Sequence, residues 1–330
     1  MSARFRAHIA TPAAEDLPEN HLQVEADPKL LPYCGDRELE HYGSNGAPHT
    51  AQTYASDQSG TKTYEFNACG LRGEDLDSKA AVRIFVCGAS YAFGTGLDWK
   101  ETWGYQLKAG IARELGLDIS WVNLLNFSQS LASANYITRT LISQCAAVRP
   151  DLVIAHYSVM SRAEYFLQGS PVGVVPVPFP WYKRWWVLRP GWRRRLFRSI
   201  PGPKDRAVAS KRLQAWNQYS RLFSAETAIV NTLTNILLLQ SFCHVRGIDC
   251  LISWVQHDSL RDKRFSENPA ISPLIEQLDR ERFCSFSLVD ADICTDVAAD
   301  EIHPGVRSNQ TFAERLLRLY MQVRSSTPSS

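Results

Sequence analysis

The architecture of this chain is indicated first by the segment Val82-Arg-Ile-Phe-Val-Cys-Gly88-Ala-Ser90. Its first part is a short apolar run that ends at a glycine, as a buried strand does. Helical patterns and further strands of this kind alternate after it. We expect strands over 82–87, 121–125, 151–157, 249–255 and 286–289, and helices over 101–115, 134–147, 224–245 and after Pro304. This alternation predicts an α/β domain built on a five-stranded parallel sheet.

The chain divides into three parts by composition. Residues 1–60 are polar and rich in turn-forming residues, which predicts an irregular N-terminal extension. Residues 61–324 contain the periodic segments and form the single domain, with an insertion at 170–212 before the long helix. Residues 325–330 are low in complexity, which predicts a disordered tail.

Composition excludes several classes of protein. The 330 residues are 45% hydrophobic and 21% charged with a net charge of +2, which excludes a histone-like or acidic-tail protein. The N-terminus lacks the apolar stretch of a signal peptide, and the most apolar run, 236–239, is too short to span a bilayer. The eight cysteines stand singly, with no CxxC pair and no metal-ligand spacing. We therefore expect reduced thiols, no bound metal and a cytoplasmic protein.

Ser90 is the first candidate for chemistry. It follows the first strand within the glycine-rich segment 88–96, and functional groups in such sheets lie beyond the carboxyl ends of the strands. A serine that starts a helical segment gains the positive end of the helix dipole and a free backbone N–H. The GxSxG pattern is not met because Ala92 replaces its second glycine, and no phosphate-binding Gly-Lys-Ser/Thr follows. A plain glycine-rich turn with a surface serine remains the alternative.

His303 is the second candidate, within Asp300-Glu-Ile-His303-Pro304 ahead of the last helix. A carboxylate three residues before an imidazole can hold the ring in one tautomer, with Nδ1–H toward Asp300 and Nε2 free as a base. Pro304 suits the first turn of a helix and restrains the backbone beside the histidine. The alternative is a helix-capping aspartate beside a solvent-exposed histidine. The order Ser…Asp…His favours a catalytic triad.

These segments resemble the SGNH/GDSL hydrolase superfamily of serine esterases and acyl-transfer enzymes. Residues 66–73 (FNACGLRG) resemble an N-x-x-G-x-R-G segment of one bacterial branch. Residues 88–96 (GASYAFGTG) resemble the G-D-S-x-x-x-G block with Ala89 in place of Asp, and residues 300–304 (DEIHP) match the D-x-x-H block. The resemblance covers residues 62–165 and 245–323. It implies a flavodoxin-like three-layer α/β/α fold with a five-stranded parallel sheet, a Ser90–His303–Asp300 triad and no cofactor.

The oxyanion hole is where the sequence departs from this family. Beyond the Ser90 N–H, such enzymes use a glycine N–H after the second strand and an Asn side chain after the third. The second strand leads into 126–133 (NFSQSLAS), which has no glycine, so that Ser128 or Ser130 would have to donate. Met160 stands near the usual Asn, which leaves as substitutes Ser158, Ser161 and Arg162. Loss of one oxyanion donor typically costs about 10²–10³ in rate.

The insertion at 170–212 is basic and rich in tryptophan. Its prolines predict an extended first part. Residues 181–212 contain eleven Lys or Arg and one Asp, so this window carries +10 and the rest of the chain −8. The candidate contact residues are Trp181, Trp185, Trp186, Trp192, Arg193, Arg194 and Arg195. Such a segment suits a membrane surface, where the protein would be peripheral, or an anionic polymer such as a glycan, or a lid packed on the core. No motif predicts specific nucleic-acid binding.

Together these features predict a serine esterase or acyltransferase. Its substrate would be a small-molecule or glycan ester, an O-acyl ester of a sugar, a lipid or a natural-product scaffold. The alternative is a non-catalytic SGNH-like module that binds a membrane surface or an anionic glycan through 170–212. No residue distinguishes hydrolysis from transfer to an acceptor.

Overall fold

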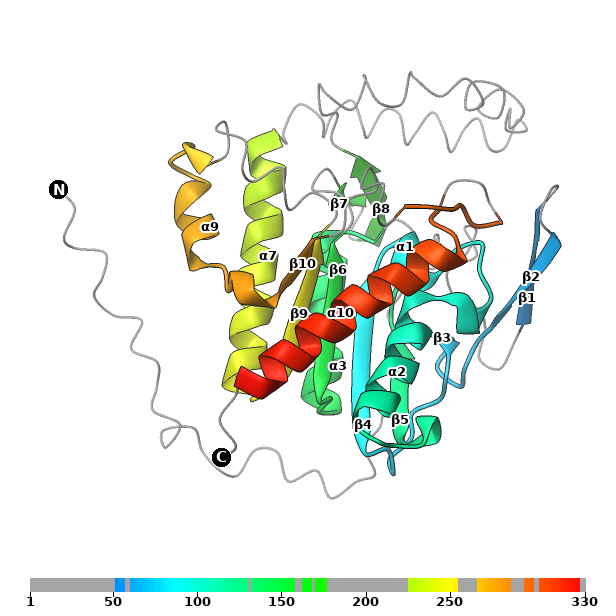
Figure 1. Cartoon of the computed structure of the whole chain (residues 1–330). Coiled ribbons are helices and arrows are strands. Elements are labelled where there is room, and N and C mark those ends of the chain that lie inside the picture. Colours follow the sequence, from blue (N-terminus) through cyan, green and yellow to red (C-terminus); the bar gives the residue numbers. More distant parts are fainter. Residues whose placement is uncertain are drawn as a thin grey trace, which may run out of the picture.

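A six-stranded sheet lies at the centre of the molecule in the computed structural model (Figure 1). The structure describes residues 51–56, 60–129, 132–157, 162–167, 170–176, 225–254, 266–285, 294–299 and 303–326. The strands of this sheet are β3 (Arg72–Gly73), β4 (Val82–Gly88), β5 (Val122–Asn126), β6 (Leu152–Tyr157), β9 (Asp249–Trp254) and β10 (Phe283–Ser285). Their spatial order is β10-β9-β6-β4-β5-β3.

Five of these strands are parallel, as predicted. β4 pairs with β5 and β6, β6 pairs with β9, and β9 pairs with β10, each in parallel. Numbered along the chain, the five are arranged 2-1-3-4-5, which is the flavodoxin-like order. The expected strand count of five needs one correction, because β3 adds a sixth strand antiparallel to β5. A two-residue strand is too short to leave a pattern in the sequence.

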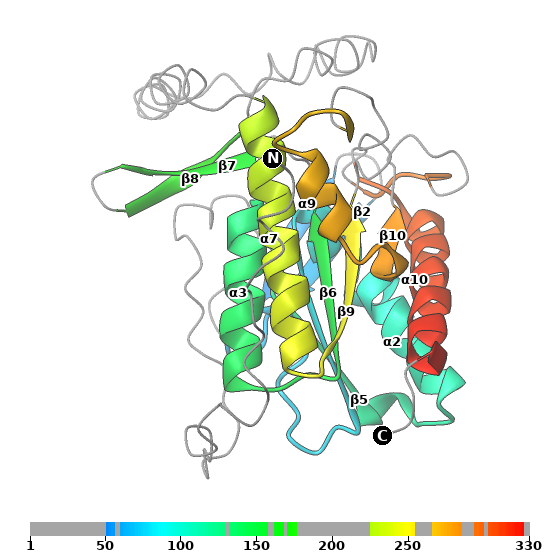
Figure 2. The same cartoon turned by 90° about the vertical axis from the view of Figure 1, so that its left-hand side faces the viewer.

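Helices cover both faces of the sheet (Figure 2). One face carries α3 (Ala134–Ala147), α7 (Ala225–Val245) and α9 (Ser272–Gln277), and the other carries α2 (Trp103–Glu114) and α10 (Val306–Ser326). Successive β4 side chains alternate between the two cores: Phe85 packs with α3 and α7, whereas Ile84 and Val86 pack with α2 and α10. A sheet buried on both faces explains why the strands are almost wholly apolar. The three-layer α/β/α arrangement is confirmed.

Most predicted elements appear with small shifts at their ends. The helix expected over 134–147 is α3 with the same bounds, and it begins after Ser133, whose hydroxyl accepts the Tyr136 N–H. α2 begins later than expected because Thr102 caps it, and the preceding turn η3 (Trp99–Glu101) is a separate 3₁₀ helix. β10 lies just ahead of the strand expected over 286–289, which falls outside the described residues.

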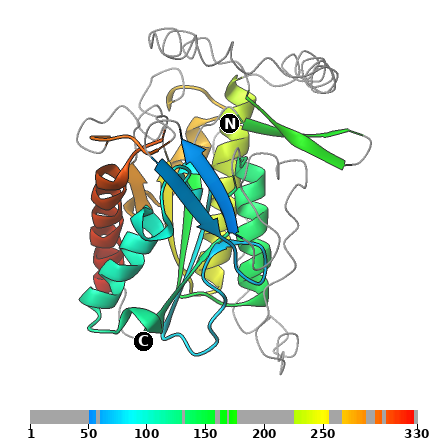
Figure 3. The same ribbon diagram turned by 90° about the vertical axis from the view of Figure 1, so that its right-hand side faces the viewer.

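Two ends of the chain differ from expectation. The segment predicted to be irregular contains β1 (Ala51–Ser56), which pairs with β2 (Gly60–Glu65) in an antiparallel hairpin (Figure 3, blue). Residues 325 and 326 were expected in the disordered tail, but α10 continues through them to Ser326. The hairpin is tied to the domain by Lys62, which pairs with Asp98 and Glu101. Ser325 and Ser326 are exposed, and their hydroxyls donate to the Gln322 and Val323 carbonyls within the helix.

A second hairpin precedes the basic segment. β7 (Arg162–Leu167) and β8 (Ser170–Pro176) pair antiparallel and extend away from the sheet (Figure 2). The extended conformation predicted for the first part of the 170–212 insertion is therefore confirmed over 170–176. Residues 177–212, with all the candidate tryptophans and arginines, lie outside the described residues.

α7 contains a segment, Glu226–Val245, that is long and apolar enough by composition to cross a membrane. Its residues Ile229, Leu233, Ile236 and Leu239 are fully buried in the core formed with α3 and β9. Packing against α3 and β9 accounts for the apolar residues on that side of α7, whereas Leu238 and Val245 are exposed.

Candidate active site

Ser90 lies at the carboxyl edge of the sheet, directly after β4. The strand order reverses between β4 and β6, and this topological switch point is where open α/β sheets form their binding crevices. Gly88 ends β4 where the chain passes close to β6. A Cβ there would lie 2.6 Å from the Ala92 Cβ and 2.8 Å from the His156 Cβ, so no larger residue fits without a shift.

Ser90 starts the one-turn helix α1 (Ser90–Phe93). Its backbone N–H belongs to a first helical turn, where N–H groups have no acceptor within the helix. α1 ends at Gly94, which has φ +84°, and the Gly94 and Thr95 N–H groups return to the Ser90 carbonyl at 3.0 and 3.1 Å. We call residues 89–97 the serine loop.

His303 is carried by a segment tied down at both ends, residues 294–305, which we call the histidine loop. Val297 and Pro304 form a β-bridge, and the Ala298 N–H donates to the His303 carbonyl at 2.7 Å. The Ala299 N–H donates to the Gly96 carbonyl of the serine loop at 3.1 Å. These contacts bring the two loops, about two hundred residues apart in sequence, against each other.

Asp296 anchors the histidine loop to α10. Its carboxylate accepts hydrogen bonds from the Arg307 N–H and the Ser308 N–H, both at 2.9 Å, and from the Ser308 hydroxyl at 2.6 Å. Burial alone would raise the pKa of Asp296, but these hydrogen bonds outweigh burial and the pKa lies below its usual value. The carboxylate therefore caps α10 as an anion at the positive end of the helix dipole.

The two predicted reactive side chains meet. His303 Nε2 lies 2.7 Å from Ser90 Oγ, the distance of a nucleophile and its general base. The Ser90 side chain is half-buried on the sheet edge and is bordered by buried neighbours on α1. Asp300, the predicted third member of the triad, lies outside the described residues, so its role stays a prediction.

Of the predicted oxyanion donors other than Ser90, the structure describes the side chain of Ser128 alone. The Ser128 N–H donates to Asn126 Oδ1 at 3.0 Å, so this amide is already engaged. Ser128 Oγ is buried and makes no hydrogen bond within the described part of the chain, which leaves the hydroxyl as the group that could donate. Of Arg162 only the backbone is described, at the start of β7. The other candidates, Ser130, Ser158 and Ser161, lie outside the described residues.

Arg72 is a site residue for which the sequence assigned no role. Its buried guanidinium donates to the carbonyls of Phe93 and Gly94, at 2.8 and 2.6 Å, and of Leu97, all in the serine loop. It lies over the ring of Tyr64 at 4.2 Å, and Tyr64 Oη accepts the Gly96 N–H at 2.7 Å. The only signal was the position of Arg72 in the 66–73 segment; Tyr64 had none.

A further buried polar pair lies beneath the serine loop. His156 at the end of β6 is fully buried, and its Nδ1 lies 3.0 Å from Ser253 Oγ on β9. Its ring packs against Tyr91 and Phe312. This histidine is part of the core that supports α1 rather than a second base at the surface.

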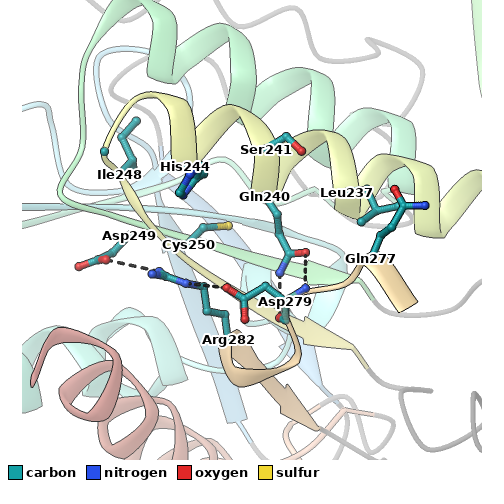
Figure 4. Close-up of a pocket in the computed structure, with 11 residues that line it drawn as sticks. Leu237, Gln240, Ser241, His244, Ile248, Asp249, Cys250, Gln277, Asp279 and Arg282 are labelled. Atoms are coloured by element: carbon teal, nitrogen blue, oxygen red, sulfur yellow. Dashed lines mark hydrogen bonds and ion pairs between the residues drawn. The ribbon is translucent and has the colours of Figure 1, made fainter. Parts of the chain in front are cut away.

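A cavity of about 650 Å³ lies at the opposite edge of the sheet, where β9 begins (Figure 4). Its polar wall is occupied by internal pairs: Arg282 contacts Asp249 at 3.4 Å and Asp279 at 3.0 Å. The cavity is remote from Ser90, which follows the other end of a parallel strand. No cluster of three His, Cys, Asp or Glu that could hold a metal occurs among the residues that the structure describes.

Comparison with known proteins gives structural likenesses only. No family model matches the sequence, and no curated protein matches it. The structure is similar to the psychrotrophic esterase EstA from Pseudoalteromonas, with 12% identity, 74% of this chain and 99% of that chain covered, and a TM-score of 0.40. It is also similar to TesA, with 16% identity, 73% and 99% covered, and a TM-score of 0.42.

A third similar structure is a protein from Desulfitobacterium hafniense described as lipolytic and of the G-D-S-L family. The identity is 10%, the covered shares are 72% of this chain and 99% of that chain, and the TM-score is 0.37. At such values the likeness says nothing about the substrate or reaction of this chain, for which the Ser90–His303 geometry is the relevant observation.

Proposed function

We propose that this protein is a serine-dependent esterase or acyltransferase. The observation that carries the proposal is the 2.7 Å contact between His303 Nε2 and Ser90 Oγ at the carboxyl edge of a parallel sheet. A hydroxyl in hydrogen-bond contact with an imidazole is activated for attack on an acyl carbonyl. A buried structural hydrogen bond would not need to lie at the switch point of the sheet, at the start of a helix.

The reaction follows from these two side chains. Ser90 Oγ attacks the ester carbonyl while its proton passes to His303 Nε2, and a tetrahedral oxyanion forms. The bond to the leaving alkoxide breaks as His303 gives that proton to it, which releases an alcohol and leaves the acyl group on Ser90. Water or an acceptor hydroxyl then attacks, gives its proton to His303, and releases the acyl group as an acid or a new ester. The proton returns to Ser90.

The oxyanion is stabilised first by the Ser90 N–H at the start of α1. Asp300 is proposed to hold the His303 ring through Nδ1, as the D-x-x-H resemblance implies. The substrate is proposed to be an O-acyl ester of a sugar, a lipid or a natural-product scaffold. No step of this reaction requires a metal or an organic cofactor.

A fluorophosphonate probe that phosphonylates activated serines tests the proposal. The wild-type protein should be labelled at neutral pH, with Ser90→Ala unlabelled and His303→Gln labelled far more slowly. Ser78→Ala is the matched control, since Ser78 is exposed ahead of β4 at the other end of the strand. A folded wild-type protein that resists labelling would contradict the proposal and favour the non-catalytic binding module.

A further inference from the structure

The serine loop is held from beneath by a buried cation. Arg72 is 1% exposed, and the three carbonyls that it contacts, of Phe93, Gly94 and Leu97, all follow Ser90 within seven residues. Its guanidinium provides several donors in one rigid plane, which a single ammonium group cannot reproduce. Arg72 thus joins the end of α1 to the turn that follows it.

Those carbonyls need such a partner because of how the loop turns. The last carbonyls of a helix receive no hydrogen bond from N–H groups within the helix. Gly94 (φ +84°) and Gly96 (φ +80°) reverse the chain directly after α1. Without Arg72, the carbonyls of Phe93 and Leu97 would lose this donor, whereas the Gly94 carbonyl also accepts the Leu97 N–H at 3.2 Å.

Arg72 is itself rigidly placed. Asn67 Oδ1 accepts the N–H groups of Cys69 and Leu71, both at 2.9 Å, which closes the turn that leads into β3. Gly73 follows with φ +105°, and a Cβ there would lie 2.4 Å from the Trp99 ring. Contacts on either side of Arg72 therefore restrain the backbone from which its side chain extends to the serine loop.

Aromatic rings complete the environment of the cation. The guanidinium carbon lies 4.2 Å from the Tyr64 ring centre and 5.0 Å from that of Phe93. Burial lowers the pKa of Arg72 to about 10, so that it still carries its charge at neutral pH. Lys62, on the same hairpin strand as Tyr64, pairs with Asp98 and Glu101 at 2.9 and 2.8 Å and ties the hairpin to the segment after the loop.

The same contacts reach the histidine. The Gly96 N–H donates to Tyr64 Oη, and the Gly96 carbonyl accepts the Ala299 N–H of the histidine loop. Gly96 is thus held on one side by Tyr64 and on the other by the segment that carries His303. Displacement of the serine loop would move both members of the reactive pair.

We propose that Arg72, together with Tyr64, is a positioning residue that sets the geometry between Ser90 and His303. The inference rests on the proposed function, since it assigns Arg72 to the same site. Arg72 touches neither reactive side chain, so its substitution should slow the chemical step without weakening ligand binding. Misplacement of reacting groups by about 1 Å can cost about 10² in rate.

The test measures fluorophosphonate labelling over a range of probe concentrations, at a temperature at which every variant is folded. Arg72→Met should lower the saturating rate by about 10²-fold and leave the half-saturating concentration unchanged. Arg72→Lys, which keeps the charge, should lie between Arg72→Met and wild type. Tyr64→Phe removes only the acceptor of the Gly96 N–H and should lower the saturating rate by about 10-fold. This variant tests the proposal if Arg72→Met fails to fold. Arg282→Met is the control, because Arg282 also bridges two segments but at the opposite sheet edge.

Hydrogen exchange of the full-length chain gives a readout that does not depend on activity. Amides of residues 93–98 should exchange faster in Arg72→Met than in wild type and at the wild-type rate in Arg282→Met. Unlabelled wild type would refute the proposed function, and unchanged exchange in Arg72→Met would refute the positioning role by itself. A labelled wild type with a folded Arg72→Met variant of equal labelling rate would likewise overturn it.

Discussion

At the scale of single residues, the candidate site consists of Ser90 and His303. Ser90 and His303 were both predicted from sequence. A serine after a glycine-rich strand end and a histidine in a D-x-x-H-P segment together form the order Ser…Asp…His of a catalytic triad. Each of the two sequence patterns is ambiguous alone, and the 2.7 Å contact shows that the two side chains lie together. The sequence contained Arg72 as part of the 66–73 motif but assigned it no role, because that role depends on backbone carbonyls that no sequence pattern identifies.

In the proposed mechanism Ser90 and His303 act as a unit, so the effects of their substitutions should not add. Ser90→Ala, His303→Ala and the double variant should each lower turnover of p-nitrophenyl acetate to a similar residual level, about 10⁴-fold or more below wild type. Steady-state kinetics on the three variants checks this. Multiplicative losses would mean that the two side chains act independently.

Gly88 should tolerate no side chain. In Gly88→Ala the added Cβ would press on Ala92 and His156, and overpacking of this kind costs about 1–3 kcal/mol. We expect a lower melting temperature and a loss of the proposed esterase activity, since α1 starts two residues later. Gly104→Ala is the control: the nearest atom to its Cβ is 3.4 Å away, and alanine should be neutral or stabilising in that helix. Equal melting temperatures for the two variants would contradict this account.

At the scale of elements, the predicted helices and strands agree best where the hydrophobic period is long. α3 has the expected bounds, and β4, β5, β6 and β9 differ by a residue at one or both ends. β3 and the β1–β2 hairpin were not predicted because they are short or polar and are stabilised by contacts across the chain. Lys62 of β2, for example, is held by Asp98 and Glu101, which lie 36 and 39 residues away.

The Asp296 cap on α10 should matter for both stability and activity. Asp296→Asn removes the negative charge at the helix N-terminus, and loss of such a charge–dipole interaction costs about 0.3–1 kcal/mol. The histidine loop should loosen, so that turnover falls as well. Thermal melting and esterase assays of the variant, with Asp118→Asn on the exposed η4 turn (Ile119–Trp121) as control, check the effect.

The pH dependence of this cap has a defined sign. The folded pKa of Asp296 is below its usual value, so the carboxylate stabilises the fold fully above the unfolded pKa and loses that contribution as pH falls through the folded pKa. The difference in melting temperature between wild type and Asp296→Asn should therefore be constant near neutrality and shrink below about pH 4. A difference that grows toward low pH would contradict the cap.

At the scale of the whole molecule, charge is unevenly distributed. Residues 181–212 carry +10 and the remainder −8, so the neutral total combines a mildly acidic chain with one basic segment. This segment follows the β7–β8 hairpin, which itself extends from the sheet beyond β6. A surface contact through the tryptophans and arginines stays a proposal.

Vesicle flotation tests that proposal. Wild-type protein should float with vesicles that contain anionic lipid, less so at high salt because the attraction is electrostatic. Replacing Trp185, Trp186 and Trp192 by Ser should lower flotation while leaving fluorophosphonate labelling of Ser90 intact. Point changes are preferable to deletion of 170–212, since residues 170–176 form β8. Equal flotation of both proteins would exclude a role for these tryptophans, and a wild-type protein that does not float would exclude the membrane-surface role.

The thiols give a further whole-molecule prediction. The seven cysteines that the structure describes form no disulfide bond with one another, and Cys87, Cys145, Cys243, Cys250 and Cys284 are buried. Burial raises the pKa of the Cys87, Cys145 and Cys284 thiols, that of Cys284 to about 12, and a hydrogen bond with Cys243 together with burial raises the pKa of Cys250. A raised pKa suppresses the reactive thiolate. At least five of the eight thiols should resist a disulfide reagent until the protein is unfolded, as titration in native and denaturing buffer would reveal.

By itself the sequence determined the α/β class and the parallel sheet, and it predicted Ser90 and His303 as the candidate nucleophile and base. These follow from local periodicity and from chemistry that is confined to a few adjacent residues. Tertiary structure alone decided that the two meet, that Ser128 has its amide engaged, and that Arg72 and Tyr64 hold the serine loop. Such relations join residues tens to hundreds of positions apart, and their energy comes from buried hydrogen bonds whose partners exist only after the chain has folded.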